Sequence, residues 1–305
     1  MSVRRRVLVA VAALGLAAYG NASALASTQN TTTASPSASG TTTQANAMDA
    51  KAHAGDWTTY HRTNARDGNA SDLAPMSQLS VDWHAQLDGA VYGQPLVVNH
   101  RIFAATENDT IYALNQDTGA VLWSMHVGQP EPQADLPCGD IDPLGITSTM
   151  VYDPATNRLF AVAETTGGHH TMVGVNADTG NLEVSAPAEP PEGDFKAHQQ
   201  RAALNLLDGR VNIAYGGLAG DCASYIGSVV SLTTKGTDKL SFAVPTTREG
   251  GIWATGGAVV DKDRLLYPVG NGESVTGYDG SDSVTALSPR LRPVDFFAPS
   301  TWADD

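Results

Sequence analysis

The sequence has only two cysteines, which excludes a disulfide-rich mini-domain and a zinc site built from four cysteines. Basic residues are scarce: 18 lysines and arginines stand against 32 aspartates and glutamates, so the formal net charge is −14. This deficit argues against nucleic acid as a partner, because a protein that binds the phosphate backbone needs a basic face. Charged residues make up only 16% of the chain, and the 42% that are hydrophobic suffice for a packed core.

Several motifs that mark common enzymes are also missing. The chain has no Gly-x-Ser-x-Gly elbow, no Walker loop and no His-Glu-x-x-His zinc motif. No apolar run reaches the length of about 20 residues that a membrane-spanning helix needs. What the chain does have is 30 glycines and 16 prolines, which is typical of many short strands joined by tight turns.

The N-terminus has the three parts of a secretory signal peptide. Residues 4–6 are arginines, residues 7–18 are apolar, and residues 24–26 read Ala-Leu-Ala, a small-residue cleavage site. An uncleaved N-terminal anchor is the alternative. We therefore predict a signal peptide over residues 1–26, a secreted or extracytoplasmic location in the cell envelope, and no membrane span in the mature chain.

Residues 27–54 form a segment of mostly Thr, Ser, Ala, Gln and Asn. No large apolar residue occurs in it before Met48. Such a segment cannot bury enough surface to offset the entropy lost on ordering. We predict a disordered linker over residues 27–54 and a folded part over residues 55–305.

The folded part is built from a repeat. Four apolar runs that begin with arginine lie at 101–105, 158–162, 210–214 and 264–267, spaced by 57, 52 and 54 residues. Each has an apolar stretch before it and another after it, with turn residues such as Asp208-Gly209 between them. Each repeat therefore predicts three or four strands joined by antiparallel hairpins. Sheets of this size cover their apolar faces by radial stacking, so we predict an all-β propeller, with a β-sandwich as the alternative.

The end of the first repeat carries the most specific motif. Residues 113–123 read Ala-Leu-Asn-Gln-Asp-Thr-Gly-Ala-Val-Leu-Trp. Asn115 begins a turn, Gly119 permits the positive φ that the turn needs, and Trp123 returns into the next strand. A flat indole can wedge between neighbouring blades and bury a large apolar area. We predict that these three residues dock one blade on another.

This motif resembles the tryptophan-docking repeat of quinoprotein-like propellers, known as PQQ repeats. The resemblance covers residues 55–305 and includes the opening Trp57-Thr58-Thr59-Tyr60. It implies a fold that cofactor-bearing alcohol dehydrogenases share with non-catalytic scaffolds. It also implies seven or eight blades, whereas about four are recognisable here. We expect an incomplete propeller, with a compact four-bladed ring or closure through another subunit as alternatives.

The two cysteines, Cys138 and Cys222, lie in glycine-rich polar segments. Because an exported protein meets an oxidising compartment, we predict a disulfide between them that joins adjacent blades, with two free thiols as the alternative. The resemblance also implies a vicinal cysteine pair in many of the alcohol dehydrogenases, and this chain lacks one.

Three further residues are candidates for a cofactor site. The resemblance implies that Asn271 is a calcium ligand next to the quinone PQQ, and that an acidic ligand comes from the preceding blade, where Asp221 is the nearest acid. Trp253 is a candidate to line a central channel and stack on a ligand. A turn residue is the alternative for Asn271, and blade packing for Trp253. Calcium needs six to eight oxygen ligands, which the sequence does not assemble, so PQQ and calcium stay candidates only.

Two other polar segments are candidates for metal binding. His169-His170 lies in a glycine-rich hairpin, and adjacent residues on a strand point to opposite faces. We therefore expect these two, and His198, to be solvated loop histidines rather than transition-metal ligands. The acidic turn over residues 278–283 is a candidate calcium loop, although such a run more commonly caps a hairpin.

Two functions fit these patterns. We predict an exported, non-catalytic propeller that binds a protein or a small ligand through loops at one face or through the channel, with no catalytic residue assigned. The alternative is a PQQ- and calcium-dependent oxidoreductase, or a degenerate or truncated relative of one, in which the quinone supplies the redox chemistry. A third alternative is a fragment without an independent function.

Overall fold

The computed structural model describes residues 55–74 and 78–303, so the predicted signal peptide and linker over residues 1–54 lie outside the described residues. The described part is built from antiparallel β-sheets, with short 3-10 turns at Gln133–Asp135 and Phe195–Ala197. Within it, no helix combines the length and the apolar character required for a membrane crossing.

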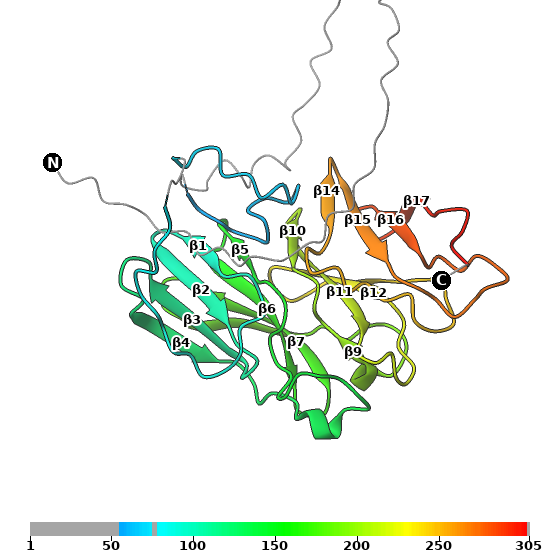
Figure 1. Ribbon diagram of the computed structural model, residues 1–305, viewed down its shortest axis with the longest axis horizontal. Helices are drawn as coiled ribbons and strands as arrows, with labels where there is room; N and C mark the ends of the chain where they lie inside the picture. The colour runs from blue at the N-terminus through cyan, green and yellow to red at the C-terminus, as the bar shows by residue number, and fades with distance from the viewer. Residues whose placement is uncertain (1–54, 75–77, 304–305) are drawn as a thin grey trace, which may run out of the picture.

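Four sheets lie around a common centre in chain order, as Figure 1 shows. In each, consecutive strands pair as antiparallel neighbours, and the short strand β9 pairs with β11 in addition. The strands, taken sheet by sheet, are β1 (Leu96–Val98), β2 (Arg101–Ala105), β3 (Thr110–Asn115) and β4 (Val121–His126); β5 (Val151–Asp153), β6 (Arg158–Thr165), β7 (His169–Asn176) and β8 (Leu182–Pro187); β9 (His198–Gln199), β10 (Asn205–Leu207), β11 (Arg210–Gly217), β12 (Ser228–Thr233) and β13 (Leu240–Ala243); and β14 (Val259–Asp261), β15 (Arg264–Val269), β16 (Ser283–Leu287) and β17 (Pro293–Phe297).

The four arginine-led runs of the sequence are the second strands of the four sheets, β2, β6, β11 and β15. The predicted all-β propeller of about four blades is therefore confirmed. The local signal was sufficient because each sheet is a series of hairpins, whose pairing the turns determine directly.

Three apolar clusters fill the spaces between neighbouring sheets. In β6, Leu159 enters the cluster of the first and second sheets, and Phe160 enters that of the second and third. Successive side chains of a strand point to opposite faces, so a strand covered on both faces needs an unbroken apolar run. The sheets therefore pack face to face, each one against its neighbours in the chain.

Two tryptophans dock neighbouring segments on turns of the same design. The Trp83 indole lies on Gly119 and donates a hydrogen bond from Nε1 to the carbonyl of Gln116 at 3.1 Å. Trp123, in β4, lies on Gly180 of the second sheet and donates in the same way, at 3.2 Å, to the carbonyl that follows Asn176. Gly119 thus receives the tryptophan from the segment before it, and Trp123 reaches the turn of the next sheet.

Asn115 builds the turn that receives Trp83. Its Oδ1 accepts hydrogen bonds from the backbone N–H groups of Asp117 and Thr118, both at 3.0 Å. Gly119 then adopts a φ of +69°. An amide side chain at the first position and glycine at the last are what this turn requires, because the glycine has a left-handed backbone.

The tryptophan docking can be tested with two glycine variants of unequal surroundings. Both Gly180 and Gly209 have positive φ, of +75° and +70°. An added Cβ would lie 2.8 Å from the Trp123 ring at Gly180 and would have no atom within 4 Å at Gly209. Gly209→Ala should lower the free energy of unfolding by about 1–2 kcal/mol, through backbone strain alone. Gly180→Ala should lower it by about 1–3 kcal/mol more, because its new Cβ would also clash with the Trp123 ring. Urea unfolding of both variants measures this, and equal losses would contradict the docking.

The fourth sheet has an open apolar face within the described part of the chain. Ile111, Met172 and Val229 hold equivalent register positions in the first three sheets and are fully buried by the next sheet. Val284 holds that position in the fourth sheet and is 40% exposed, and its cross-strand partner Phe297 is 69% exposed. The four sheets therefore form a stack in which the fourth sheet has one covered face.

Candidate cofactor cavity

A cavity of about 560 Å³ lies where loops of all four sheets converge. In a four-stranded antiparallel sheet, the start of the first strand and the turn between the second and third strands lie at the same end. The links between sheets and the central hairpins therefore gather at one face of the stack. The cavity is lined by Tyr60, Tyr92, Gly93, Asp140, Ile141, Thr147, Thr149, Gln199, Arg201, residues 217–221, Trp253, Thr255 and Asn271.

Three residues singled out in the sequence meet in this cavity. Asp221 comes from the β11–β12 hairpin, Trp253 from the link between the third and fourth sheets, and Asn271 from the β15–β16 hairpin. They come together because these segments all reach the same end of the stack.

Trp253 is held in a cradle of three glycines. A Cβ added to Gly216, Gly270 or Gly251 would lie 2.2, 2.3 or 2.5 Å from the indole. Its Nε1 donates a hydrogen bond of 3.0 Å to the carbonyl of Gly217. The half-buried ring is therefore fixed in place, and it lines the cavity as an apolar platform on which a planar ligand can stack.

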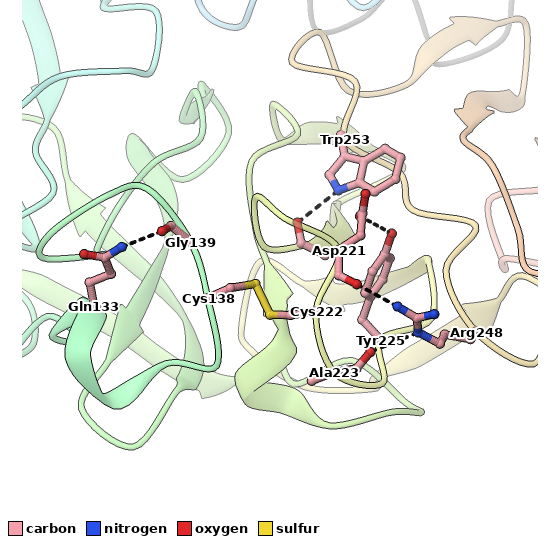
Figure 2. The surroundings of a disulfide bond; sticks show 10 residues. Gln133, Cys138, Gly139, Asp221, Cys222, Ala223, Tyr225, Arg248 and Trp253 are labelled. Carbon is pink, nitrogen blue, oxygen red and sulfur yellow. Dashed lines mark hydrogen bonds between the residues drawn. A yellow bond between two sulfur atoms is a disulfide. The ribbon is translucent and has the colours of Figure 1, made fainter.

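Asp221 is fixed by groups on its own side of the cavity (Figure 2). One carboxylate oxygen accepts a hydrogen bond of 2.7 Å from the Tyr225 hydroxyl. Burial and this hydrogen bond raise the pKa of Tyr225, so its hydroxyl stays protonated as the donor. The Asp221 carbonyl accepts a hydrogen bond of 2.6 Å from the Arg248 guanidinium.

Asn271 is exposed and is held by Glu249 and Gly250, which precede Trp253 in the link between the third and fourth sheets. Its Nδ2 donates to Glu249 Oε2 at 3.3 Å, and its carbonyl accepts from the Gly250 N–H at 2.7 Å. Glu249 in turn pairs with Arg248 at 2.9 Å. The side chain is therefore oriented by protein contacts on one side.

The predicted calcium ligands do not assemble a calcium shell. Across residues 55–74 and 78–303, no three or more His, Cys, Asp or Glu side chains are arranged to hold a metal ion. Asp221 and Asn271 would supply two side chains toward the six to eight oxygens that calcium takes. In the acidic turn, Asp279 accepts hydrogen bonds from Ser281, which is a local turn cap. The cavity residues therefore fit a planar organic group, whereas Asp221 and Asn271 by themselves do not make a calcium site.

Arg201, which the sequence analysis did not single out, places a cation at the cavity. It is exposed, and within the described residues no hydrogen bond or ion pair engages its guanidinium. A free guanidinium beside an aromatic platform is suited to a carboxylate, which it can bind through two parallel hydrogen bonds. The sequence signal that could have identified Arg201 was its position in the link between the second and third sheets. Trp253 lies in the corresponding link between the third and fourth sheets.

Cys138 and Cys222 form a disulfide that ties two walls of the cavity together (Figure 2). Cys138 lies in the link between the first and second sheets, and Cys222 lies in the β11–β12 hairpin of the third sheet. Residues 140–141 follow the first cysteine and residues 220–221 precede the second, and all four line the cavity. A Cβ on Gly220 would lie 3.6 Å from Cys138 Sγ, so the bond lies directly behind the cavity lining.

Two of the three histidines predicted to be solvated are fully buried, which corrects that expectation. In His198, Nδ1 donates to the Asp194 carbonyl at 2.7 Å, and Nε2 accepts from the Ile226 N–H at 3.2 Å. Burial lowers the pKa of His198, in agreement with a neutral ring. Its role is to join two segments of the third sheet, because both nitrogens are occupied by backbone groups.

His170 lies between two carboxylates. Its Nδ1 is 3.1 Å from Glu189 and its Nε2 is 3.4 Å from Glu164. Burial lowers the pKa of His170, but the two carboxylates outweigh burial and raise the pKa to about 9. The glycine-rich hairpin sequence predicted that the His170 side chain is exposed to solvent. The ring is buried instead, because Tyr215 of the third sheet covers it in an edge-on contact.

A group of buried acids lies next to the cavity lining. Glu107 Oε2 accepts hydrogen bonds from the Gly145 N–H at 2.7 Å and from the Thr147 hydroxyl at 3.2 Å. Burial raises the pKa of Glu107 to about 7. Asp109 is fully buried and neither of its carboxylate oxygens has a hydrogen-bond partner. Burial, with the charges of Glu107 and Glu164, raises the pKa of Asp109 to about 9.

Comparison with known proteins gives one family and a group of dehydrogenase relatives. The family model described as outer membrane protein assembly factor BamB, of the PQQ-repeat type, matches residues 78–267. A polyvinylalcohol dehydrogenase of Sphingopyxis sp. (strain 113P3) is 26% identical over 247 residues, which are 72% of this chain and 35% of that protein. The dehydrogenase subunit of a quinone alcohol dehydrogenase of Gluconacetobacter polyoxogenes is 27% identical over 209 residues, 64% of this chain and 26% of that protein.

Solved structures agree on the fold. A quinohemoprotein alcohol dehydrogenase from Comamonas testosteroni superposes with a TM-score of 0.61 at 16% identity, over 84% of this chain and 43% of that one. One from Pseudomonas putida HK5 superposes with a TM-score of 0.60 at 18% identity, over 84% and 41%. The chain spans about a third or less of the length of the two curated relatives above.

Proposed function

Since this chain belongs to the PQQ-repeat family of β-propellers, we propose that its cavity binds a planar quinone of the PQQ class and serves an alcohol oxidoreductase. The observation that carries the proposal is Trp253, fixed in its three-glycine cradle as one wall of a cavity of about 560 Å³. That volume is in the range of small-molecule sites. The dehydrogenase relatives support the second of the two functions that the sequence left open.

Different residues at the cavity would contact different parts of such a ligand. Trp253 offers the stacking surface, and Arg201 offers a cation to a ligand carboxylate. Asp221 and Asn271 present oxygen and amide groups whose positions their neighbours fix. When bound, a quinone of this class would supply the two-electron, two-proton acceptor for the oxidation of an alcohol to a carbonyl compound. We assign no calcium, because no three or more His, Cys, Asp or Glu side chains among the described residues are arranged to hold a metal ion.

The competing proposal is that the protein is a non-catalytic propeller that binds a ligand. Both proposals assume that the protein is exported. The disulfide supports export, since such bonds persist in oxidising compartments. Both functions share the fold, so quinone binding by the folded protein distinguishes them.

Isothermal titration of the folded protein with PQQ tests the proposal. We expect saturable binding near one PQQ per chain. Arg201→Ala removes an exposed side chain that the fold does not need, and it should weaken binding about tenfold or more, because a charged hydrogen-bonded pair contributes about 1.5–3 kcal/mol. Trp253→Phe should weaken binding several-fold.

Trp302→Phe is the matched control, because Trp302 packs on Tyr278 of the fourth sheet and not at the cavity. Its affinity should equal that of the wild type. Adding calcium or a chelator should leave the affinity unchanged. Absence of binding to a protein that is folded by circular dichroism would reject the quinone site and favour the non-catalytic propeller.

A further inference from the structure

Within the described residues, the disulfide is the one covalent or polar link between two walls of the cavity, which are residues 136–143 and residues 218–226. Within the described residues, no hydrogen bond or ion pair joins residues 136–143 to residues 218–226. Apart from the Cys138–Cys222 bond, the two segments meet only through packing such as that of Gly139 on Leu218. The disulfide is therefore the contact whose removal tests what fixes the separation of these walls.

The two walls are unequally supported without that bond. Asp221 is anchored to Tyr225 and Arg248, and the backbone of the same hairpin bonds to the segments around Asp194 and Glu249. The other wall is held within its own loop, where Gln133 donates hydrogen bonds from its side-chain amide to the Gly139 carbonyl and from its backbone N–H to the Asp142 carboxylate. Opening the disulfide should therefore release residues 136–143 and leave the Asp221 hairpin in place.

We propose that the Cys138–Cys222 disulfide positions the cavity wall at residues 140–141 for ligand binding, so that its loss lowers the affinity of the cavity. The inference rests on the proposed quinone site and adds a determinant of its affinity. The cysteines act through residues 140–141 and 220–221, which line the cavity. In the cell, a thiol reductant would open the bond by exchange, giving two cysteine thiols and the oxidised disulfide of the reductant.

The test compares PQQ affinity in the wild type, Cys138→Ser, Cys222→Ser and the double variant, without added thiols, because thiols react with quinones. Each single variant should bind about tenfold more weakly than the wild type, and the double variant should bind no more weakly than either, since all three lack the same bond. Titrations are run at a temperature at which every variant is folded. Gly209→Ala serves as a control that is destabilised far from the cavity and should keep the wild-type affinity.

Hydrogen exchange of the free proteins is the second readout. Exchange in the double variant should rise in residues 136–143 and stay unchanged in residues 218–226. If the wild type binds PQQ and the double variant binds it equally well, the positioning role is wrong and the quinone site stands. If the wild type does not bind PQQ, the proposed quinone site is wrong. Hydrogen exchange in residues 136–143 then tests by itself whether the disulfide positions that wall. An unchanged or evenly spread exchange would overturn it.

Discussion

Loss of the Cys138–Cys222 bond should lower the free energy of unfolding by about 4–5 kcal/mol. The bond closes a loop over a sequence separation of 84 residues, and the chain-entropy description of a loop of that size gives this value. Because the loop contains the whole second sheet, its opening gives the unfolded chain many more conformations. Guanidinium unfolding of the wild type and of the Cys138→Ser/Cys222→Ser double variant measures the difference.

A reductant provides the control for this prediction. Adding it to the wild type should reproduce the loss, whereas adding it to the double variant should change nothing. A difference of less than about 1 kcal/mol would mean that the unfolded chain is already compact across this loop. Affinity and stability are then separate consequences of one bond, because the affinity is compared among folded molecules only.

The stability of Asp109→Asn should fall less steeply with rising pH than the stability of the wild type. The pKa of Asp109 is about 9 in the folded protein, against an ordinary value of 3.8. The protonated carboxyl therefore contributes stability that is fully present below pH 3.8 and is lost as the pH rises toward 9. In that window the loss is about 1.4 kcal/mol per pH unit for one group.

Between pH 5 and pH 8, the wild type should therefore lose about 3–4 kcal/mol relative to Asp109→Asn. The difference between two pH values removes the constant cost of the buried amide, which is the same at both. Denaturant unfolding at the two pH values provides the measurement. Asp117→Asn, in the exposed turn after β3, is the control for the same chemical change outside the core. A parallel pH dependence of Asp109→Asn and the wild type would show that water reaches this carboxyl.

Sequence patterns predicted all four sheets but only part of the cavity. The sheets were easier to predict because they depend on local geometry. The strands follow from hairpins, whose information lies within about 20 residues. Asn271 was singled out by the PQQ-repeat resemblance, and Trp253 was singled out as an aromatic residue in a glycine-rich segment; both line the cavity. Asp109 and Glu107 were missed because Glu107-Asn108-Asp109 has the composition of an exposed turn.

Segments outside the hairpin bury that turn, and the link into the second sheet is one of them. A Cβ on Gly145 would lie 2.3 Å from the Glu107 carbonyl, so the link into the second sheet passes directly over the hairpin. His170 is buried in the same way, by Tyr215 of the next sheet. Contacts between sheets of this kind depend on how the repeats stack. A pattern within one repeat does not contain them.

The open face of the fourth sheet has a thermodynamic consequence. Because each sheet contacts only its neighbours in the stack, the free energy of folding is close to a sum of single-sheet and nearest-neighbour contributions. Within the described residues, the second and third sheets each have two neighbouring sheets, the first and fourth have one each, and the outer face of the fourth is the exposed one. Within the described stack, unfolding should therefore begin at the fourth sheet, the end unit with the exposed face. Asn271 belongs to that sheet, and Trp253 lies in the link to it. A ligand in the cavity joins the end unit to the rest of the array, so binding and the ordering of the fourth sheet are thermodynamically linked.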